Sequence, residues 1–114
     1  MAEVRRKSLA LSRLFIDLVA QDCAGLGLQL ASPARDEARG SQVSYAHDEG
    51  YAVMQALIAR GVIGDFRAPD LMRFGFAPLY NGFAEIVRAA EILGEILSSR
   101  EWDQPRFHRR AKVT

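Results

Sequence analysis

The chain has 114 residues, of which 49% are hydrophobic and 25% are charged, a composition typical of one compact domain and too short for a second full one. Fifteen Lys and Arg residues against 14 Asp and Glu residues give a net charge of +1. So small a charge does not attract a polyanion through the field of the whole molecule, so nucleic acid is not an expected partner.

Two further features limit location and chemistry. The apolar runs are far shorter than the roughly 18 residues that a spanning helix needs, and the N-terminus lacks the apolar segment of a signal peptide. We therefore expect a cytoplasmic protein with no membrane partner. Cys23 is the only cysteine, which excludes an internal disulfide and a cysteine-cluster zinc site and predicts a buried thiol. The chain has only two His and two Lys residues, so it can form few of the side-chain combinations that enzymes use for catalysis.

The first third of the chain predicts a helix, a strand and a loop. Apolar residues between Leu11 and Val19 recur at helical spacing, which indicates an amphipathic helix over residues 4–20. Leu26, Leu28 and Leu30 alternate with other residues, as in a half-buried strand. The charged, proline-containing segment 32–40 is typical of an exposed loop.

The middle of the chain predicts a strand followed by a helix. Residues 41–45 alternate again, with Val43 and Tyr45 on one face. Asp48 is a candidate N-cap for a helix that ends at Gly61, a residue suited to a left-handed stop.

The last part predicts two strands, a helix and a tail. Short strands are expected over residues 62–66 and 71–76, joined by a turn at Pro69; the second is expected to end before Pro78. Asn81 can cap a helix whose apolar stripe runs over residues 83–97. From residue 98 the pattern becomes a basic tail, whose aromatic residues Trp102 and Phe107 are expected to dock onto the domain.

This order of elements predicts an α+β domain with a small, mostly antiparallel sheet and helices on one of its faces. The connections are too short for most parallel crossovers, except the one through the second helix. We divide the domain into a leading helix (4–20), an α/β core (26–97) and a C-terminal tail (98–114).

Arg73 is the strongest candidate for a functional side chain. On the predicted strand 71–76 it shares a face with Leu71 and Gly75, and glycine leaves room beside the guanidinium. Such an arginine can bind a carboxylate through two parallel hydrogen bonds. A merely solvated arginine on an exposed face remains the alternative on spacing alone.

Other candidate groups favour structural roles. Asp65 and Asp70 could suggest a metal or acid/base site, but turn chemistry around Pro69 with Asp65 pairing an arginine is favoured. His47 has no second histidine or cysteine at ligand spacing, which favours a loop histidine. Glycines at 25, 27 and 40 lack the lysine and helix of a phosphate loop. We therefore predict no metal-binding, cofactor-binding or directly catalytic residue in this chain.

The motifs of the chain resemble those of bacterial kynureninases. Residues 39–83 (RGSQVSYAHDEGYAVMQALIARGVIGDFRAPDLMRFGFAPLYNGF) are similar to the C-terminal part of that family. The opening VRRKSLALSRLFIDLV and the ending PRFHRRAKVT also resemble it, in the same order. The resemblance covers nearly the whole chain.

The resemblance implies the small C-terminal domain of a pyridoxal-phosphate enzyme with the aspartate-aminotransferase fold (fold type I). Such an enzyme cleaves L-kynurenine hydrolytically to anthranilate and L-alanine in tryptophan catabolism. The arginine of the family's RFG segment, which binds the substrate α-carboxylate, corresponds to Arg73. The expected partners are a cofactor-binding large domain, L-kynurenine and, as a homo-oligomer, further copies of the chain.

The cofactor domain of the family has no counterpart here, and neither Lys7 nor Lys112 matches the place of the lysine that holds pyridoxal phosphate. We therefore expect no cofactor and no activity in the chain alone. Two alternatives stay open: a non-catalytic module that binds amino acids or other carboxylates through Arg73, and an interaction module that associates through the face that would meet the large domain. Surface apolar residues of that uncovered face, above all on the leading helix, should drive self-association or make the chain marginal in solution.

Overall fold

A computed structural model describes residues 2–31, 42–75 and 82–108 of the chain. These residues form four helices and four strands: α1 (Ala2–Asp22), β1 (Gln29–Leu30), β2 (Gln42–Ala46), α2 (Gly50–Ala59), β3 (Asp65–Arg67), β4 (Leu71–Gly75), α3 (Phe83–Ser99) and α4 (Pro105–His108).

The strands form one antiparallel sheet in the order β1-β2-β4-β3. β4, the last strand in sequence, lies in the interior of the sheet between β2 and β3. β2 and β3 are both antiparallel to β4, so the crossover through α2 joins two parallel strands that are not neighbours. The predicted fold class, α+β with a mostly antiparallel sheet, is confirmed.

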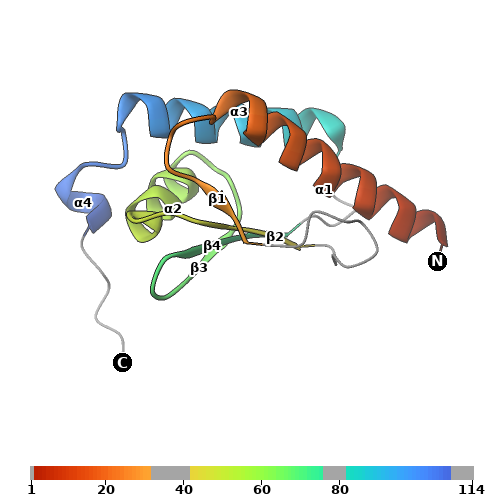
Figure 1. Ribbon diagram of the computed structural model, residues 1–114, viewed down its shortest axis with the longest axis horizontal. Helices are drawn as coiled ribbons and strands as arrows, with labels where there is room; N and C mark the ends of the chain where they lie inside the picture. The colour runs from red at the N-terminus through yellow and green to blue at the C-terminus, as the bar shows by residue number, and fades with distance from the viewer. Residues whose placement is uncertain (1, 32–41, 76–81, 109–114) are drawn as a thin grey trace.

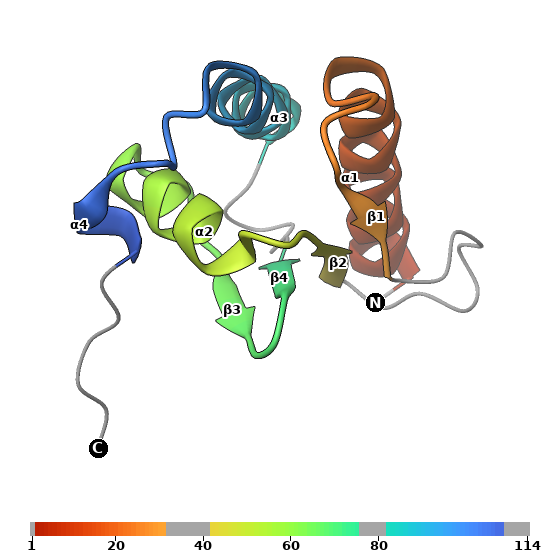
Figure 2. The same ribbon diagram turned by 60° about the vertical axis from the view of Figure 1, so that its left-hand side comes forward.

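The three longer helices lie on one side of the sheet, as the views in Figure 1 and Figure 2 both show. The core forms between that side and the helices, where the sheet contributes four buried residues: Val43, Tyr45, Met72 and Phe74. No described helix covers the opposite side, which we call the open face of the sheet.

α1 is an integral part of this core. Leu11, Phe15 and Val19 are at most 2% exposed, as the predicted amphipathic stripe requires. The Phe15 ring lies 5.1 Å from that of Phe74 and 6.2 Å from that of Tyr45, so the helix packs directly on the sheet. α1 also packs along α3, so the first and the last of the three longer helices are in contact.

The segment after α1 is mostly irregular, so the strand predicted through Leu26, Leu28 and Leu30 was largely wrong. Only Gln29–Leu30 pairs with β2. Gly25 and Gly27 have φ angles of 76° and 86°, in the left-handed region that a regular strand excludes. Leu26 and Leu28 still pack against the core, which explains their alternation.

α2 begins differently from the prediction. Its N-cap is Glu49 rather than Asp48, and no side chain caps it in the usual way. Instead, the Glu49 backbone N–H donates to Nδ1 of His47 at 2.9 Å, so an imidazole satisfies a donor at the start of the helix. The predicted stop is confirmed: Gly61 follows the helix with φ 89°.

The strands after α2 are shorter than predicted. β3 covers 65–67 instead of 62–66, and β4 ends at Gly75 within the described residues. Phe76, Pro78 and Asn81, expected at the end of the strand and the start of the helix, lie outside the described residues, as does the predicted loop 32–40. Gly82 is the N-cap of α3, and the backbone N–H of Gly82 donates to the Glu85 carboxylate at 3.0 Å.

The C-terminal segment docks on the domain as predicted. Trp102 is 7% exposed and Phe107 is 4% exposed, and α4, which the sequence pattern did not predict, packs against α2. Residues 109–114 lie outside the described part. Within the described ranges, no helix combines the length and apolar character needed to cross a membrane.

Candidate functional site

Arg73 lies at the centre of the open face. Its neighbours Met72 and Phe74 are buried on the helix side, and because side chains alternate along a strand, Arg73 must point to the other side. β4 is an interior strand, so Arg73 has a direct partner on each side: Ser44 in β2 and Asp65 in β3. These three residues form a row across the open face.

Asp65 and Arg73 form a bidentate ion pair. Nε of Arg73 donates to Oδ1 of Asp65 and Nη2 donates to Oδ2, both at 2.7 Å. The guanidinium holds the pKa of the Asp65 carboxyl below its usual value, mainly through these hydrogen bonds, and the pKa of Arg73 is raised in turn. The predicted pairing of Asp65 with an arginine is confirmed.

This pair uses only one edge of the guanidinium. A guanidinium carries five N–H groups and can meet a carboxylate along its Nε edge or along its Nη1–Nη2 edge. Asp65 occupies the Nε–Nη2 edge, and no described residue bonds to Nη1. Among the described residues, the Nη1–Nη2 edge of the guanidinium is therefore outside the ion pair.

The charge around the pair favours an anion. Arg67 pairs with Leu71, two residues before Arg73, and so belongs to the same open face. Its charge also lowers the pKa of Asp65. With one carboxylate between two guanidinium groups, this part of the face keeps a net positive charge.

Gly75, the second predicted site residue, is exposed at the end of β4 opposite Gln42. The expected space beside it depends on residues 76–81, which lie outside the described residues, so that expectation stays a prediction.

No metal centre forms among the described residues. No group of three or more His, Cys, Asp or Glu residues in these ranges could hold a metal ion. The backbone carbonyl of Asp70 accepts a hydrogen bond from the His47 N–H at 3.1 Å, a structural contact at the turn before β4.

His47 has a structural role, as its sequence context favours. Its Nδ1 accepts from Glu49, so Nε2 carries the proton of the neutral ring and lies 3.2 Å from the Leu26 carbonyl oxygen. The ring also meets Trp102 edge to face at 6.1 Å. The imidazole thus links the segment after α1, the start of α2 and the C-terminal segment.

Cys23 is unsuited to nucleophilic chemistry. The residue is 4% exposed, and burial, with a smaller contribution from Asp22, raises the pKa of the thiol to about 11. A thiol with this pKa stays protonated near neutral pH.

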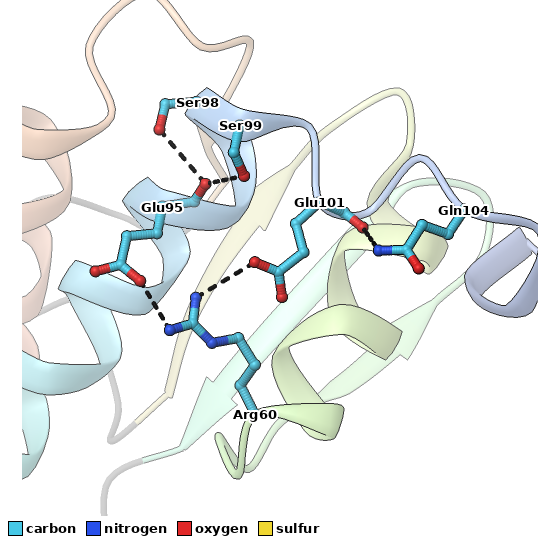
Figure 3. A network of polar contacts seen from close by, with 6 residues as sticks. All are labelled: Arg60, Glu95, Ser98, Ser99, Glu101 and Gln104. Atoms are coloured by element: carbon cyan, nitrogen blue, oxygen red, sulfur yellow. Dashed lines mark hydrogen bonds and ion pairs between the residues drawn. The ribbon is translucent and has the colours of Figure 1, made fainter.

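A second arginine forms a network that the sequence pattern did not predict (Figure 3). Arg60, at the end of α2, pairs with Glu95 of α3 at 2.8 Å and with Glu101 after α3 at 3.5 Å. The Glu101 carbonyl also accepts from the side-chain amide of Gln104 at 2.7 Å. Both acids are distant from Arg60 in sequence, so no local spacing signals the contact; the network joins α2 to the C-terminal segment and lies outside the Arg73 row.

Comparison with known proteins gives a consistent result. Residues 4–93 match the family model described as Kynureninase C-terminal domain. The whole chain is 58% identical to kynureninase from Pseudomonas fluorescens, and it is 53% identical to the kynureninases of Burkholderia mallei (strain SAVP1) and Burkholderia pseudomallei (strain K96243). In each case the alignment covers 100% of this chain and 27% of the relative. The chain thus spans about a quarter of the length of these relatives.

Proposed function

The chain belongs to the kynureninase C-terminal domain family, and from that premise we propose that it is the small, substrate-binding part of a kynureninase. In this proposal Arg73 binds the α-carboxylate of L-kynurenine, and the complete enzyme releases anthranilate and L-alanine. The observation that carries the proposal is the guanidinium of Arg73, which stands on the open face with one bidentate edge outside its pair with Asp65.

The substrate role assigned to Arg73 follows from what a carboxylate needs. Two parallel N–H donors on one planar group fix both the position and the orientation of a carboxylate, and the attached α-carbon is fixed with it. The side chain of Arg73 is 25% exposed, and its charged end remains accessible to a ligand. Its role is therefore to bind and orient the substrate.

Pyridoxal phosphate, which the family name implies, would withdraw electrons from the substrate and make its α-proton acidic. The described residues do not fit a site for this cofactor. Their one lysine, Lys7, lies on α1 in the helical layer, whereas Arg73 faces away from that layer. We therefore assign the cofactor to the part of a kynureninase that this chain does not cover, and we expect the chain alone to be inactive.

A chimera tests the proposal. This chain replaces the matching segment of the Pseudomonas fluorescens kynureninase, and the release of anthranilate is measured in the presence of pyridoxal phosphate. The wild-type chimera should be active. Arg73→Ala should lower kcat/KM for kynurenine about 100-fold, because two charge-assisted hydrogen bonds are lost. Arg13→Ala, on the exposed surface of α1, is the matched control. An inactive wild-type chimera, or an unchanged kcat/KM in Arg73→Ala, would contradict the proposal.

A non-catalytic carboxylate-binding module is the second candidate, since the Arg73 row is complete within this chain. Calorimetric titration of the 114-residue chain with L-kynurenine and L-alanine distinguishes the two candidates when combined with the chimera. Binding that Arg73→Ala abolishes, together with an inactive chimera, would favour the module. The expected cytoplasmic location and homo-oligomeric state belong to the first proposal and stay predictions.

A further inference from the structure

The geometry points to a distinct role for Asp65: it is a positioning residue that holds the Nε–Nη2 edge of Arg73 and leaves the Nη1–Nη2 edge to receive the substrate carboxylate. This inference rests on the proposed function, because it takes Arg73 as the carboxylate-binding residue. It adds a second residue to the site, and it specifies which atoms of the guanidinium meet the ligand.

The first argument is the geometry of the ion pair. Both hydrogen bonds are 2.7 Å long, and both carboxylate oxygens are used. A single contact would let the guanidinium rotate, whereas two parallel contacts fix the plane of the group and its direction in that plane. A long, flexible side chain is thereby ordered before a ligand arrives.

The second argument is the place of Asp65 in the sheet. It lies directly opposite Arg73 on the neighbouring strand, so strand pairing sets the distance between the two backbones. The Asp65 side chain is 56% exposed and the Arg73 side chain is 25% exposed, so Arg73 is the more enclosed side chain as a whole and its charged end remains accessible to solvent.

The third argument is charge. Pairing with Asp65 neutralises Arg73, which by itself would weaken the attraction for a second carboxylate. Arg67 on the same face restores a positive charge, and its influence already reaches Asp65. Two guanidinium groups can therefore accommodate two carboxylates, one from Asp65 and one from the ligand.

The opposite arrangement makes a different prediction. If the substrate displaced Asp65 from the Nε–Nη2 edge, Asp65 would compete with the substrate, and removing its charge would tighten binding. A positioning role requires that removing the charge weakens binding. Asp65→Asn keeps the shape of the side chain and removes the charge, so it separates the two roles.

The test measures kcat and KM for kynurenine in the chimera described above, with Asp65→Asn, Asp65→Glu and Arg73→Ala. We expect Asp65→Asn to raise KM about tenfold with kcat changed less than twofold, since orientation of the carboxylate is lost before any reacting group is affected. Asp65→Glu, which keeps the charge, should recover part of the loss. Asp17→Asn is the matched control, because it removes the carboxylate of another Asp–Arg pair, on α1.

A second measurement does not depend on activity. In the 114-residue chain, the Nε–H proton of Arg73 should give a protected NMR signal that Asp65→Asn removes through faster exchange with water. Asp17→Asn should leave this signal unchanged. A protected signal that persists in a folded Asp65→Asn variant would overturn the inference.

The outcomes separate the inference from the proposed function. A raised KM in Arg73→Ala with an unchanged KM in Asp65→Asn rejects the role of Asp65 and leaves the proposed function standing. A lowered KM in Asp65→Asn also rejects it and identifies Asp65 as a competitor. An unchanged kcat/KM in Arg73→Ala, or an inactive wild-type chimera, rejects the proposed function itself.

Discussion

Arg73 shows how much a single side chain depends on the register of its strand. A shift of β4 by one residue would turn the guanidinium into the core and place Met72 or Phe74 on the open face. The burial of those two neighbours therefore fixes the direction of Arg73. The two hydrogen bonds to Asp65 then fix the guanidinium itself. Core packing thus sets the direction of the Arg73 side chain, and the ion pair sets the orientation of its charged end.

The Asp65–Arg73 pair predicts a titration. The pKa of Asp65 lies below its usual value because Arg73 donates two hydrogen bonds to the ionised carboxyl. In Arg73→Gln, carbon NMR should show this pKa rising toward the usual value of about 4. Asp103, whose partners are Arg100 and His108, should titrate as before.

The sign of the pH effect on stability follows from this shift. A carboxyl whose pKa is lower in the folded state contributes stability above the unfolded pKa, and the contribution is lost as the pH falls through the folded pKa. The difference in free energy of unfolding between the wild type and Asp65→Asn should therefore shrink below about pH 4. A difference that grows on acidification would contradict the assigned ion pair.

Gly64, just before β3, allows a close approach of two backbone segments. A Cβ atom there would lie 2.8 Å from the Arg73 carbonyl oxygen and 2.9 Å from Cε of Met54. Because the carbonyl belongs to an interior strand and cannot move aside, Gly64→Ala should destabilise the fold by about 1–3 kcal/mol in denaturant titration. Gly94→Ala, within α3, is the control, since its Cβ would make only ordinary contacts, with Asp22 at 3.5 Å and with Sγ of Cys23 at 3.9 Å. That change should stabilise the fold by up to about 1 kcal/mol, so equal effects of the two substitutions would contradict this account.

At the scale of the elements, the sequence predicts best where a pattern is long. The stripes of α1 and α3 are long enough to reveal both helices, and the core residues on β2 and β4 follow from alternation. The prediction of a strand through Leu26 and Leu28 was wrong because apolar residues also alternate in this loop, where Gly25 and Gly27 turn the chain. The predicted start of α2 was wrong because the backbone N–H of Glu49 donates to the His47 ring, and histidine is not among the residues that capping preferences include.

The sequence predicted part of the candidate site through the same kind of local pattern. Strand alternation placed Arg73 on a face with Gly75, and turn chemistry suggested that Asp65 pairs with an arginine. Which arginine it pairs with, and along which edge, depends on the register between β3 and β4, which the sequence pattern leaves undetermined. The Arg60 network was missed because its partners meet only through tertiary packing.

α1 should be indispensable to the fold. Phe15 is fully buried and touches two rings of the sheet, so Phe15→Ala should cost about 3–5 kcal/mol of unfolding free energy in denaturant titration. Ile63→Ala is the control, because Ile63 is 88% exposed, and it should change the stability by less than about 0.5 kcal/mol. A small effect at Phe15 would mean that α1 does not pack on the sheet as described.

At the scale of the whole molecule, exposed apolar side chains favour association. The large ones among the described residues are Leu30, Ile58, Ile63, Phe83 and Val87. Phe83 and Val87 are one turn apart on α3, whereas none of the five lies among the α1 residues whose exposure is described. The start of α3 is therefore a second candidate for self-association, beside the leading helix that the sequence suggested, which stays a prediction.

We expect the 114-residue chain to associate as its concentration rises, because Phe83 and Val87 remain partly exposed to water. Sedimentation velocity should show an apparent mass that increases with concentration and falls toward the monomer in the Phe83→Ser/Val87→Ser double variant. Arg88→Ser, a polar neighbour on α3, is the control. A monomer at every concentration up to the millimolar range would refute this expectation.

The packing of α1 on α3 also bears on how the chain acquires its fold. These helices begin at residues 2 and 83, so the contact that completes the core forms only after most of the chain has been synthesised. β4, an interior strand, likewise follows both of its neighbours, β2 and β3, in sequence. A nascent chain on the ribosome should therefore keep the apolar face of α1 exposed until α3 emerges, and it should fold late and in a single step.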